Sequence, residues 1–229
     1  FYFMLLGDFK SVRKNVELRT YILMIAGATA LITANIHSMF PTIGKAFRYA
    51  VFQVVTIITT TGYATTDFAK WPMFSRAIIM MLTVVGACAS STGGGIKVSR
   101  LLVGIKCVKR EIVQLAHPKS VGIIQIGGKK VSSDVLRTIY IYFIAYIGIL
   151  ISSILLVSLD NFDFETTFSA VLTTFGNVGP GMAKVGPMGN FADFSPLSKL
   201  VLCFDMLAGR LEIFPFLVLF TAPAWRRKF

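Results

Sequence analysis

Long uncharged runs of apolar residues dominate the pattern of this chain. Three of them, at positions 20–44, 77–96 and 138–159, contain no Asp, Glu, Lys or Arg, and each is close to the roughly 20 residues that a helix needs to cross about 30 Å of hydrocarbon. A fourth run, at 200–225, is as long but contains three charged side chains. We expect those charges to face protein or water, because a charge at the bilayer centre costs at least about 2.5 kcal/mol. The pattern predicts four membrane-spanning segments.

Two shorter uncharged runs, at 49–66 and 166–183, lie between the predicted spans. Each begins with a sequence that is compatible with a helix and continues into residues such as Gly and Thr, with Pro in the second run. Non-helical backbone at membrane depth is tolerated only inside protein or along a water-filled cavity. We interpret each run as a half-helix followed by an extended loop that lines a pore.

The two short runs also share a register. Gly62 and Gly179 are 117 positions apart, and so are Phe47 and Phe164. A spanning segment precedes and follows each run, which predicts an all-α membrane protein in which a unit of span, pore half-helix, filter loop and span is used twice. A glycine can also mark a tight turn between helices, but two glycines in register favour the repeat.

Composition and charge agree with a membrane environment. The chain is 55% hydrophobic and 15% charged, which is too apolar for an ordinary soluble domain. Most of its 23 Lys and Arg residues lie before the first span, between the second and third, and after the fourth, and the positive-inside rule makes that side cytoplasmic. The net charge of +12 is then explained by topology and by anionic lipid headgroups, so we expect membrane lipid as a partner and no nucleic acid.

Several motifs make the sequence similar to the Trk/Ktr/HKT superfamily of potassium transporters, and the second half resembles its TrkH/TrkG branch. In the first half the resemblance rests on Thr59-Thr60-Thr61-Gly62-Tyr63, Thr65-Thr66-Asp67-Phe68 and Ser90-Ser91-Thr92-Gly93-Gly94-Gly95-Ile96-Lys97. In the second half it rests on Asn177-Val178-Gly179-Pro180-Gly181, Gly189-Asn190-Phe191 and Met206-Leu207-Ala208-Gly209-Arg210-Leu211-Glu212-Ile213-Phe214-Pro215.

The resemblance implies the organisation of a larger protein. Members carry four repeats around a pseudo-fourfold pore, so this chain corresponds to the C-terminal half, with the third and fourth pore repeats, and the missing N-terminal half is a partner. Positions 1–18 would be the cytoplasmic end of a preceding helix and a linker, and 19–107 the third repeat. A basic cytoplasmic linker would occupy 108–135, and the fourth repeat 136–229.

The resemblance also implies an ion-binding filter. Carbonyl oxygens can replace the hydration shell of K⁺, and a glycine reaches backbone conformations that a side chain forbids. The filter residues implied are Thr60, Thr61, Gly62, Tyr63, Asn177, Val178 and Gly179, with K⁺ at Thr60, Thr61, Asn177 and Val178. K⁺ is the transported ion, and no covalently bound cofactor is expected. The two glycines favour potassium, while a sodium-permeable transporter of the same fold stays open because the first repeat's filter is absent.

A glycine-rich stretch follows the first filter and cannot form a straight helix by propensity alone. By resemblance it is an intramembrane loop that obstructs the pore and moves on gating, with the residues Gly86, Ser90, Ser91, Gly93, Gly94 and Gly95. Close helix packing through small residues is the alternative. A phosphate-binding loop is disfavoured, because Lys97 is followed by Val98 rather than by Ser or Thr.

Arg210 is the candidate for a fixed charge in the pore, where it would form an electrostatic barrier to cations. An internal ion pair with Asp205 or Glu212 is the alternative, although neither has the helical spacing of three or four. The same three residues could form the polar site of a membrane enzyme, but no nucleophile or metal cluster accompanies them, so we expect no enzyme.

The function expected from these features is potassium uptake across the cytoplasmic membrane of a bacterium or archaeon. Relatives implied by the resemblance work with cytosolic, nucleotide-binding regulatory subunits of the TrkA type, and we expect a homodimer. The basic linker is either a docking surface for that subunit or a cluster that contacts lipid headgroups.

Overall fold

The computed structural model describes residues 15–89, 91–117, 122–211 and 213–218, so the expected tail and linker at 1–14 lie outside the described residues. The described chain is helical, as predicted. The first half contains α3 (Val16–Ile36), η1 (His37–Met39), α4 (Ile43–Ile58), η2 (Phe68–Lys70), α5 (Met73–Val84) and α6 (Val98–Ala116). A hairpin of β1 (Gln125–Ile126) and β2 (Lys129–Lys130) follows, and then α7 (Ser133–Val157), η3 (Ser158–Asp160), α8 (Phe164–Phe175), η4 (Ala183–Val185), α9 (Pro196–Arg210) and α10 (Ile213–Val218).

Among the described residues, two helices are long and apolar enough to cross a membrane. They are α3 with its 3-10 extension, Val16–Met39, and α7 with its extension, Ser133–Asp160. Both agree with predicted spans. The α3 helix begins at an N-cap, Asn15, whose side chain accepts a hydrogen bond from the Leu18 amide.

The other two predicted spans are not continuous helices. The run at 77–96 is helical only as far as Val84, because the following Gly, Ser and Thr residues have low helix propensity. The run at 200–225 is broken between Arg210 and Ile213, and its part beyond Val218 lies outside the described residues.

The helix that follows the glycine-rich stretch crosses the expected boundary between repeat and linker. The helix α6 runs through position 107 as far as Ala116, because residues 108–116 are mostly good helix formers. Beyond it, Gly127 and Gly128 both have positive φ and form the turn of the β1–β2 hairpin, where such backbone favours glycine. The linker is therefore partly helix and partly hairpin.

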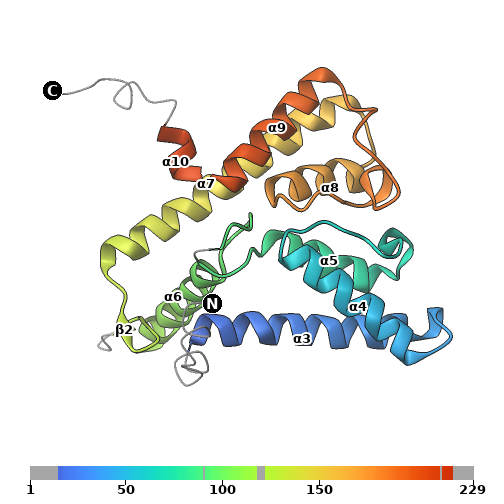
Figure 1. Ribbon diagram of the computed structural model, residues 1–229. Helices are drawn as coiled ribbons and strands as arrows, with labels where there is room; N and C mark the ends of the chain where they lie inside the picture. The colour runs from blue at the N-terminus through green and yellow to red at the C-terminus, as the bar shows by residue number, and fades with distance from the viewer. Residues whose placement is uncertain (1–14, 90, 118–121, 212, 219–229) are drawn as a thin grey trace.

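The helices form two groups that meet along one side (Figure 1). In the first group α3, α4 and α5 pack against one another, and in the second α7, α8 and α9 do so. The groups touch where α5 packs on α8. This contact brings the loops that follow α4 and α8 to the junction between the groups. These loops are the second parts of the two short runs of the sequence.

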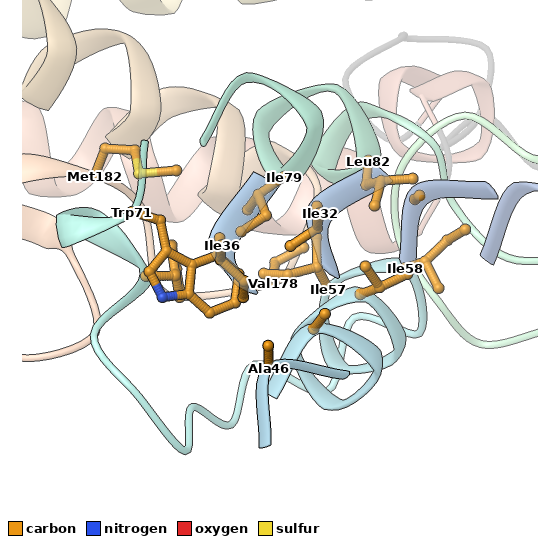
Figure 2. Close-up of a cluster of buried hydrophobic side chains, with 14 residues drawn as sticks. Ile32, Ile36, Ala46, Ile57, Ile58, Trp71, Ile79, Leu82, Val178 and Met182 are labelled. Atoms are coloured by element: carbon orange, nitrogen blue, oxygen red, sulfur yellow. The ribbon is translucent and has the colours of Figure 1, made fainter. Parts of the chain in front are cut away.

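The largest apolar core crosses this junction. Figure 2 shows buried side chains of α3, α4 and α5, among them Ile32, Ile57 and Ile79, packed together with Val178 and Met182 from the second group. Burial of this kind contributes about 25 cal/mol for each Å² of apolar surface removed from water. The segment after α8 is therefore held by the core of the other half.

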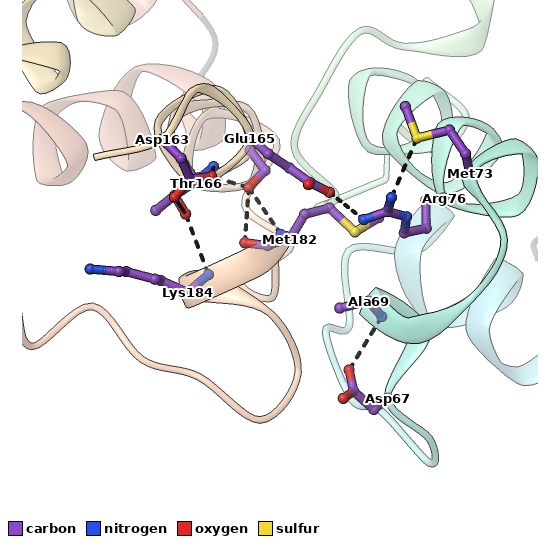
Figure 3. A network of polar contacts seen from close by, with 10 residues as sticks. Asp67, Ala69, Met73, Arg76, Asp163, Glu165, Thr166, Met182 and Lys184 are labelled. Atoms are coloured by element: carbon purple, nitrogen blue, oxygen red, sulfur yellow. Dashed lines mark hydrogen bonds and ion pairs between the residues drawn. The ribbon is translucent and has the colours of Figure 1, made fainter. Parts of the chain in front are cut away.

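A polar network also joins the two groups, at the N-terminal ends of α5 and α8. Nη1 of Arg76 in α5 lies 2.7 Å from Oε1 of Glu165 in the first turn of α8 (Figure 3). In the same region the Ser169 hydroxyl accepts a hydrogen bond from the Met182 amide, 2.9 Å away. The two groups are thus joined by apolar contacts in the centre and by an ion pair at one end.

Candidate functional site

The helices α4 and α8 end at matching positions of the two halves. Ile58 and Phe175, the last residues of these helices, are 117 positions apart. Two residues later the backbone turns left-handed in both halves, at Thr60 and Asn177, each with φ of 55°. The glycines follow, with φ of 81° at Gly62 and 104° at Gly179.

The hydrogen bonds behind these turns also match. The Thr61 amide donates to the Thr56 carbonyl at 2.9 Å, and the Val178 amide donates to the corresponding Thr173 carbonyl at 2.9 Å. One residue earlier, the Thr60 amide donates to the Ile57 carbonyl and the Asn177 amide donates to the Thr174 carbonyl, both at 3.0 Å. The helix C-terminus carries about half a negative charge, so both segments begin at a site that favours cations.

The two segments lie against each other. A Cβ on Gly62 would overlap the Val178 carbonyl oxygen, so the first segment can approach the second only because residue 62 has no side chain. Gly179 has no neighbour within 4 Å of a Cβ, and an open hollow of about 390 Å³ lies beside it, lined also by Thr174 and Asn177. The structure therefore brings the predicted filter residues of both halves together.

The side chains of the filter residues have different environments. The Thr61 and Thr59 hydroxyls lie 2.8 Å apart, and Tyr63 is 73% exposed. The amide nitrogen of Asn177 donates to the Met206 carbonyl of α9, 2.9 Å away. The side-chain nitrogen of Asn177, one of the predicted filter residues, thus fastens the segment to α9.

The glycine-rich stretch forms a folded loop between α5 and α6. Its ends pair through two backbone hydrogen bonds of 2.9 Å, from Gly86 to Ile96 and from Ile96 to Val84. Side chains would not fit there, since a Cβ on Gly86 would overlap the Gly94 carbonyl oxygen. Ser90 was also assigned to this loop, and it lies outside the described residues.

The loop contacts both predicted filter segments, which are the segments that follow α4 and α8. A Cβ on Gly94 would overlap the Gly176 carbonyl oxygen, and a Cβ on Gly93 would lie 3.4 Å from the Thr60 hydroxyl oxygen. Lys97 is only 8% exposed, and its Nζ donates to the carbonyls of Ser91 at 2.7 Å and Gly93 at 2.6 Å. The loop is thus tightly folded beneath the left-handed turns of both halves.

The charged residues of the fourth predicted span do not form one site. Asp205 is fully buried and accepts a hydrogen bond from the Ser153 hydroxyl of α7, 2.7 Å away. Arg210 is exposed at the end of α9, and Glu212 lies outside the described residues. Within the described ranges no three His, Cys, Asp or Glu side chains are placed to hold a metal ion.

Sequence reasoning missed the contacts that hold the loop and the second filter segment. These are the Asn177–Met206 hydrogen bond, the Lys97 contacts, and two hydrogen bonds that Glu17 of α3 accepts, one from the loop and one from the first turn of α6. A signal existed for Lys97, because a lysine that directly follows an uncharged run needs nearby oxygen atoms. Nothing local in the sequence pairs Glu17 with a loop more than 70 residues away.

Comparison with known proteins identifies relatives of this arrangement. Residues 15–226 match the family model TrkH, described as a cation transport protein. The Trk system potassium uptake protein TrkH of Escherichia coli K12 is 37% identical over 190 residues, which are 83% of this chain and 39% of that protein. The protein TrkG of the same strain is 31% identical over 218 residues, 95% of this chain and 44% of that protein.

A solved structure agrees with the fold. The crystal structure of the potassium transporter TrkH from Vibrio parahaemolyticus superposes with a TM-score of 0.85 at 36% identity, covering 93% of this chain and 46% of that one. The chain therefore spans less than half the length of these relatives. The expected resemblance is confirmed, and so is the expectation of a membrane transport family rather than an enzyme. This chain belongs to the TrkH family of cation transport proteins.

Proposed function

We propose that the chain forms two of the four quarters of a potassium-uptake pore in the cytoplasmic membrane of a bacterium or archaeon. The relatives are named as potassium uptake proteins, and the chain covers only 39% of the E. coli TrkH length. A missing N-terminal half would therefore supply the other two quarters. In this proposal α4 and α8 are the pore half-helices, and the segments after them are the filter.

The observation that carries the proposal is the matched pair of filter segments. Both contain a left-handed residue followed two positions later by a glycine with positive φ, and both follow a helix that ends at the same register. K⁺ needs several carbonyl oxygens directed at one axis. Two segments of the same backbone shape, in contact through Gly62 and Val178, are suited to supply such oxygens from adjacent sides.

The glycine-rich loop is proposed as the gate. It contacts the inner ends of both filter segments, at Thr60 and Gly176, which is where an obstruction would stop an ion that has passed the filter. Its backbone is dense with glycine, so its alternative conformations are sterically accessible. Small-residue packing alone would account for its close contacts but gives no reason for a buried lysine inside it.

Arg210 is proposed as the electrostatic barrier. It follows Gly209, whose missing side chain lets α9 approach the Phe175 carbonyl at the end of α8. This contact places the end of α9 next to the start of the second filter segment. A fixed positive charge there would raise the energy of a cation at the inner side of the filter.

The partners of the whole protein belong to the same proposal. They are a TrkA-like cytosolic nucleotide-binding subunit and a second copy of the complete protein. The basic surface on α6, with Lys106, Lys109 and Arg110, is a candidate contact for that subunit or for anionic lipid headgroups.

The test is uptake by the complete protein. It would be expressed with its regulatory subunit in a bacterium that lacks potassium uptake, and rubidium and sodium uptake would be compared for wild type, Gly179→Ser and Gly44→Ser at matched protein levels. Gly44 is exposed and has no neighbour within 4 Å of a Cβ, so it is the control. We expect wild type and the control to prefer rubidium and Gly179→Ser to lose that preference. Unchanged preference in Gly179→Ser would contradict the filter, and equal uptake of both ions by wild type would indicate the sodium-permeable alternative.

A further inference from the structure

The carboxylate of Glu17 links the start of α3 to the glycine-rich loop. Its Oε1 accepts one hydrogen bond from the Ala89 amide at 2.6 Å and another from the Ser99 amide at 3.2 Å. Ala89 lies in the first part of the loop, and Ser99 lies in the first turn of α6, directly after it. One oxygen atom therefore joins the two sides of the loop to each other and to α3.

These bonds add to the backbone pairing of Gly86 with Ile96 and to the Lys97 contacts that also order the loop. The loop backbone loses more conformational entropy than a segment with fewer glycines. Hydrogen bonds to an ionised acceptor are about twice as strong as those between neutral groups, and Glu17 is half-buried, which limits competition from water. Lys97 lies inside the loop and binds its central carbonyls. Glu17 lies outside and binds the amides of Ala89 and Ser99, which we call the base of the loop.

The position of the loop base sets the position of its tip. The tip residues Gly93 and Gly94 contact the filter segments at Thr60 and Gly176, and the two ends of the loop are paired through the backbone hydrogen bonds of Gly86 and Ile96. A base that is fastened to α3 keeps the tip against the filter. If the Glu17 hydrogen bonds break, the tip is held against the filter only by the contacts of Gly93 and Gly94.

We propose that Glu17 is a positioning residue that latches the glycine-rich loop against the inner side of the filter. The inference deepens the proposed function, because it rests on the loop being the gate. The first turn of α3 lies beside α6 (Figure 1) at the end that the positive-inside rule assigns to the cytoplasm. If the first turn of α3 is displaced at the cytoplasmic side, the Glu17 carboxylate transmits that displacement to the loop.

The chain offers its own reporter of the latch. Cys88 lies in the loop next to Ala89 and is half-buried, so its rate of modification by a maleimide measures how often the loop base opens. The experiment uses the complete protein in lipid vesicles with every other cysteine replaced by serine. Basal rubidium efflux is measured on the same samples without the regulatory subunit.

Three substitutions separate the latch from a simple effect of charge on the thiol. Glu17→Gln keeps an oxygen at the same reach but removes the charge, while Glu17→Asp keeps the charge but is one methylene too short for both amides. Glu17→Ala removes both. Glu111→Ala is the control, because Glu111 is exposed and pairs with its neighbour Arg110.

The latch predicts that Glu17→Ala and Glu17→Asp raise the Cys88 modification rate by about tenfold, the factor expected for losing a hydrogen bond to a charged group. Basal rubidium efflux rises in the same two variants, Glu17→Gln shows a smaller rise in both measurements because its neutral oxygen accepts weaker hydrogen bonds, and Glu111→Ala stays close to wild type. Unchanged modification in Glu17→Ala and Glu17→Asp would overturn the latch, and so would a rise in Glu17→Gln alone. Faster modification with unchanged efflux would leave the latch standing and contradict the gate.

Discussion

At the scale of single residues, the two filter glycines have the same register but different constraints. A side chain on Gly62 would overlap the Val178 carbonyl oxygen, whereas a side chain on Gly179 would meet open space. Both have positive φ, which costs an L-residue about 1–2 kcal/mol. A glycine is thus required at position 62 by both its contact with Val178 and its positive φ. At position 179 it is required by the positive φ alone.

We therefore predict that Gly62→Ala destabilises the complete protein more than Gly179→Ala does. The second substitution costs about 1–2 kcal/mol of backbone strain, and the first adds an overlap with backbone that cannot move without shifting the other filter segment. Thermal unfolding in detergent measures the difference, with Gly44→Ala as the control. Equal melting temperatures for the two filter variants would contradict the contact between the segments.

Asn177 is the residue at which the two filter segments differ most. Its amide nitrogen donates to the Met206 carbonyl, while its counterpart, Thr60, has no side chain long enough to make such a bond. We predict that Asn177→Asp lowers stability by about 1–3 kcal/mol, because a carboxylate then faces a carbonyl oxygen. Asn177→Thr should be milder and should loosen the second filter segment.

The measurement for Asn177 is thermal unfolding combined with the rubidium-to-sodium flux ratio. Lower stability and a reduced ratio in Asn177→Asp are expected. A variant with wild-type stability would show that the bond to α9 contributes nothing.

At the scale of elements, the start of α8 depends on an ionised side chain. Asp163 accepts hydrogen bonds from the Thr166 hydroxyl at 2.6 Å and from the Thr166 amide at 2.9 Å. These bonds lower the pKa of Asp163 below its ordinary value of 3.8, the side-chain bond most strongly. The carboxylate also favours the positive end of the helix.

The sign of the pH dependence follows from this lowered pKa. Asp163 stabilises the folded state fully above pH 3.8 and loses its contribution as the pH falls through its lower folded value. We predict that acid lowers the melting temperature of wild type as the pH falls below about 4, and that Asp163→Asn is less stable at neutral pH but loses less in acid. Parallel pH profiles for the two proteins would contradict the role of this N-cap.

The sequence predicted some elements better than others, for physical reasons. The helices α3 and α7 agree with predicted spans because their apolar runs have few helix-breaking residues. The end of α5 at Val84 agrees with the low helix propensity of the Gly, Ser and Thr residues that follow it. The helix α6 extends into the predicted linker as far as Ala116, because the residues there have good helix propensity.

At the scale of the whole molecule, the register of the two filter segments was visible in the sequence, but their contact was not. Register follows from spacing within one chain, whereas the approach of Gly62 to Val178 depends on packing between α5 and α8 and on a core shared by both halves. The Glu17 latch was invisible for the same reason. Nothing local in the sequence identifies Ser153 of α7 as the partner of Asp205.

Large apolar side chains also remain exposed on the helices, with Ile144 of α7 at 72% and Met81 of α5 at 70%. Lipid and the proposed N-terminal half account for such surface better than water does. The described chain is accordingly interpreted as half of a pore whose axis is lined by the two filter segments and two more from the missing half.

The most direct test of the filter is the location of a bound ion in the complete protein. Thallium(I) can stand in for K⁺ and is visible by its anomalous scattering, so crystals of the complete protein would be grown with it. The account predicts a thallium peak on the axis, coordinated by carbonyl oxygens of Thr60, Thr61, Asn177 and Val178. An ordered filter with no peak there, and thallium bound elsewhere, would contradict it.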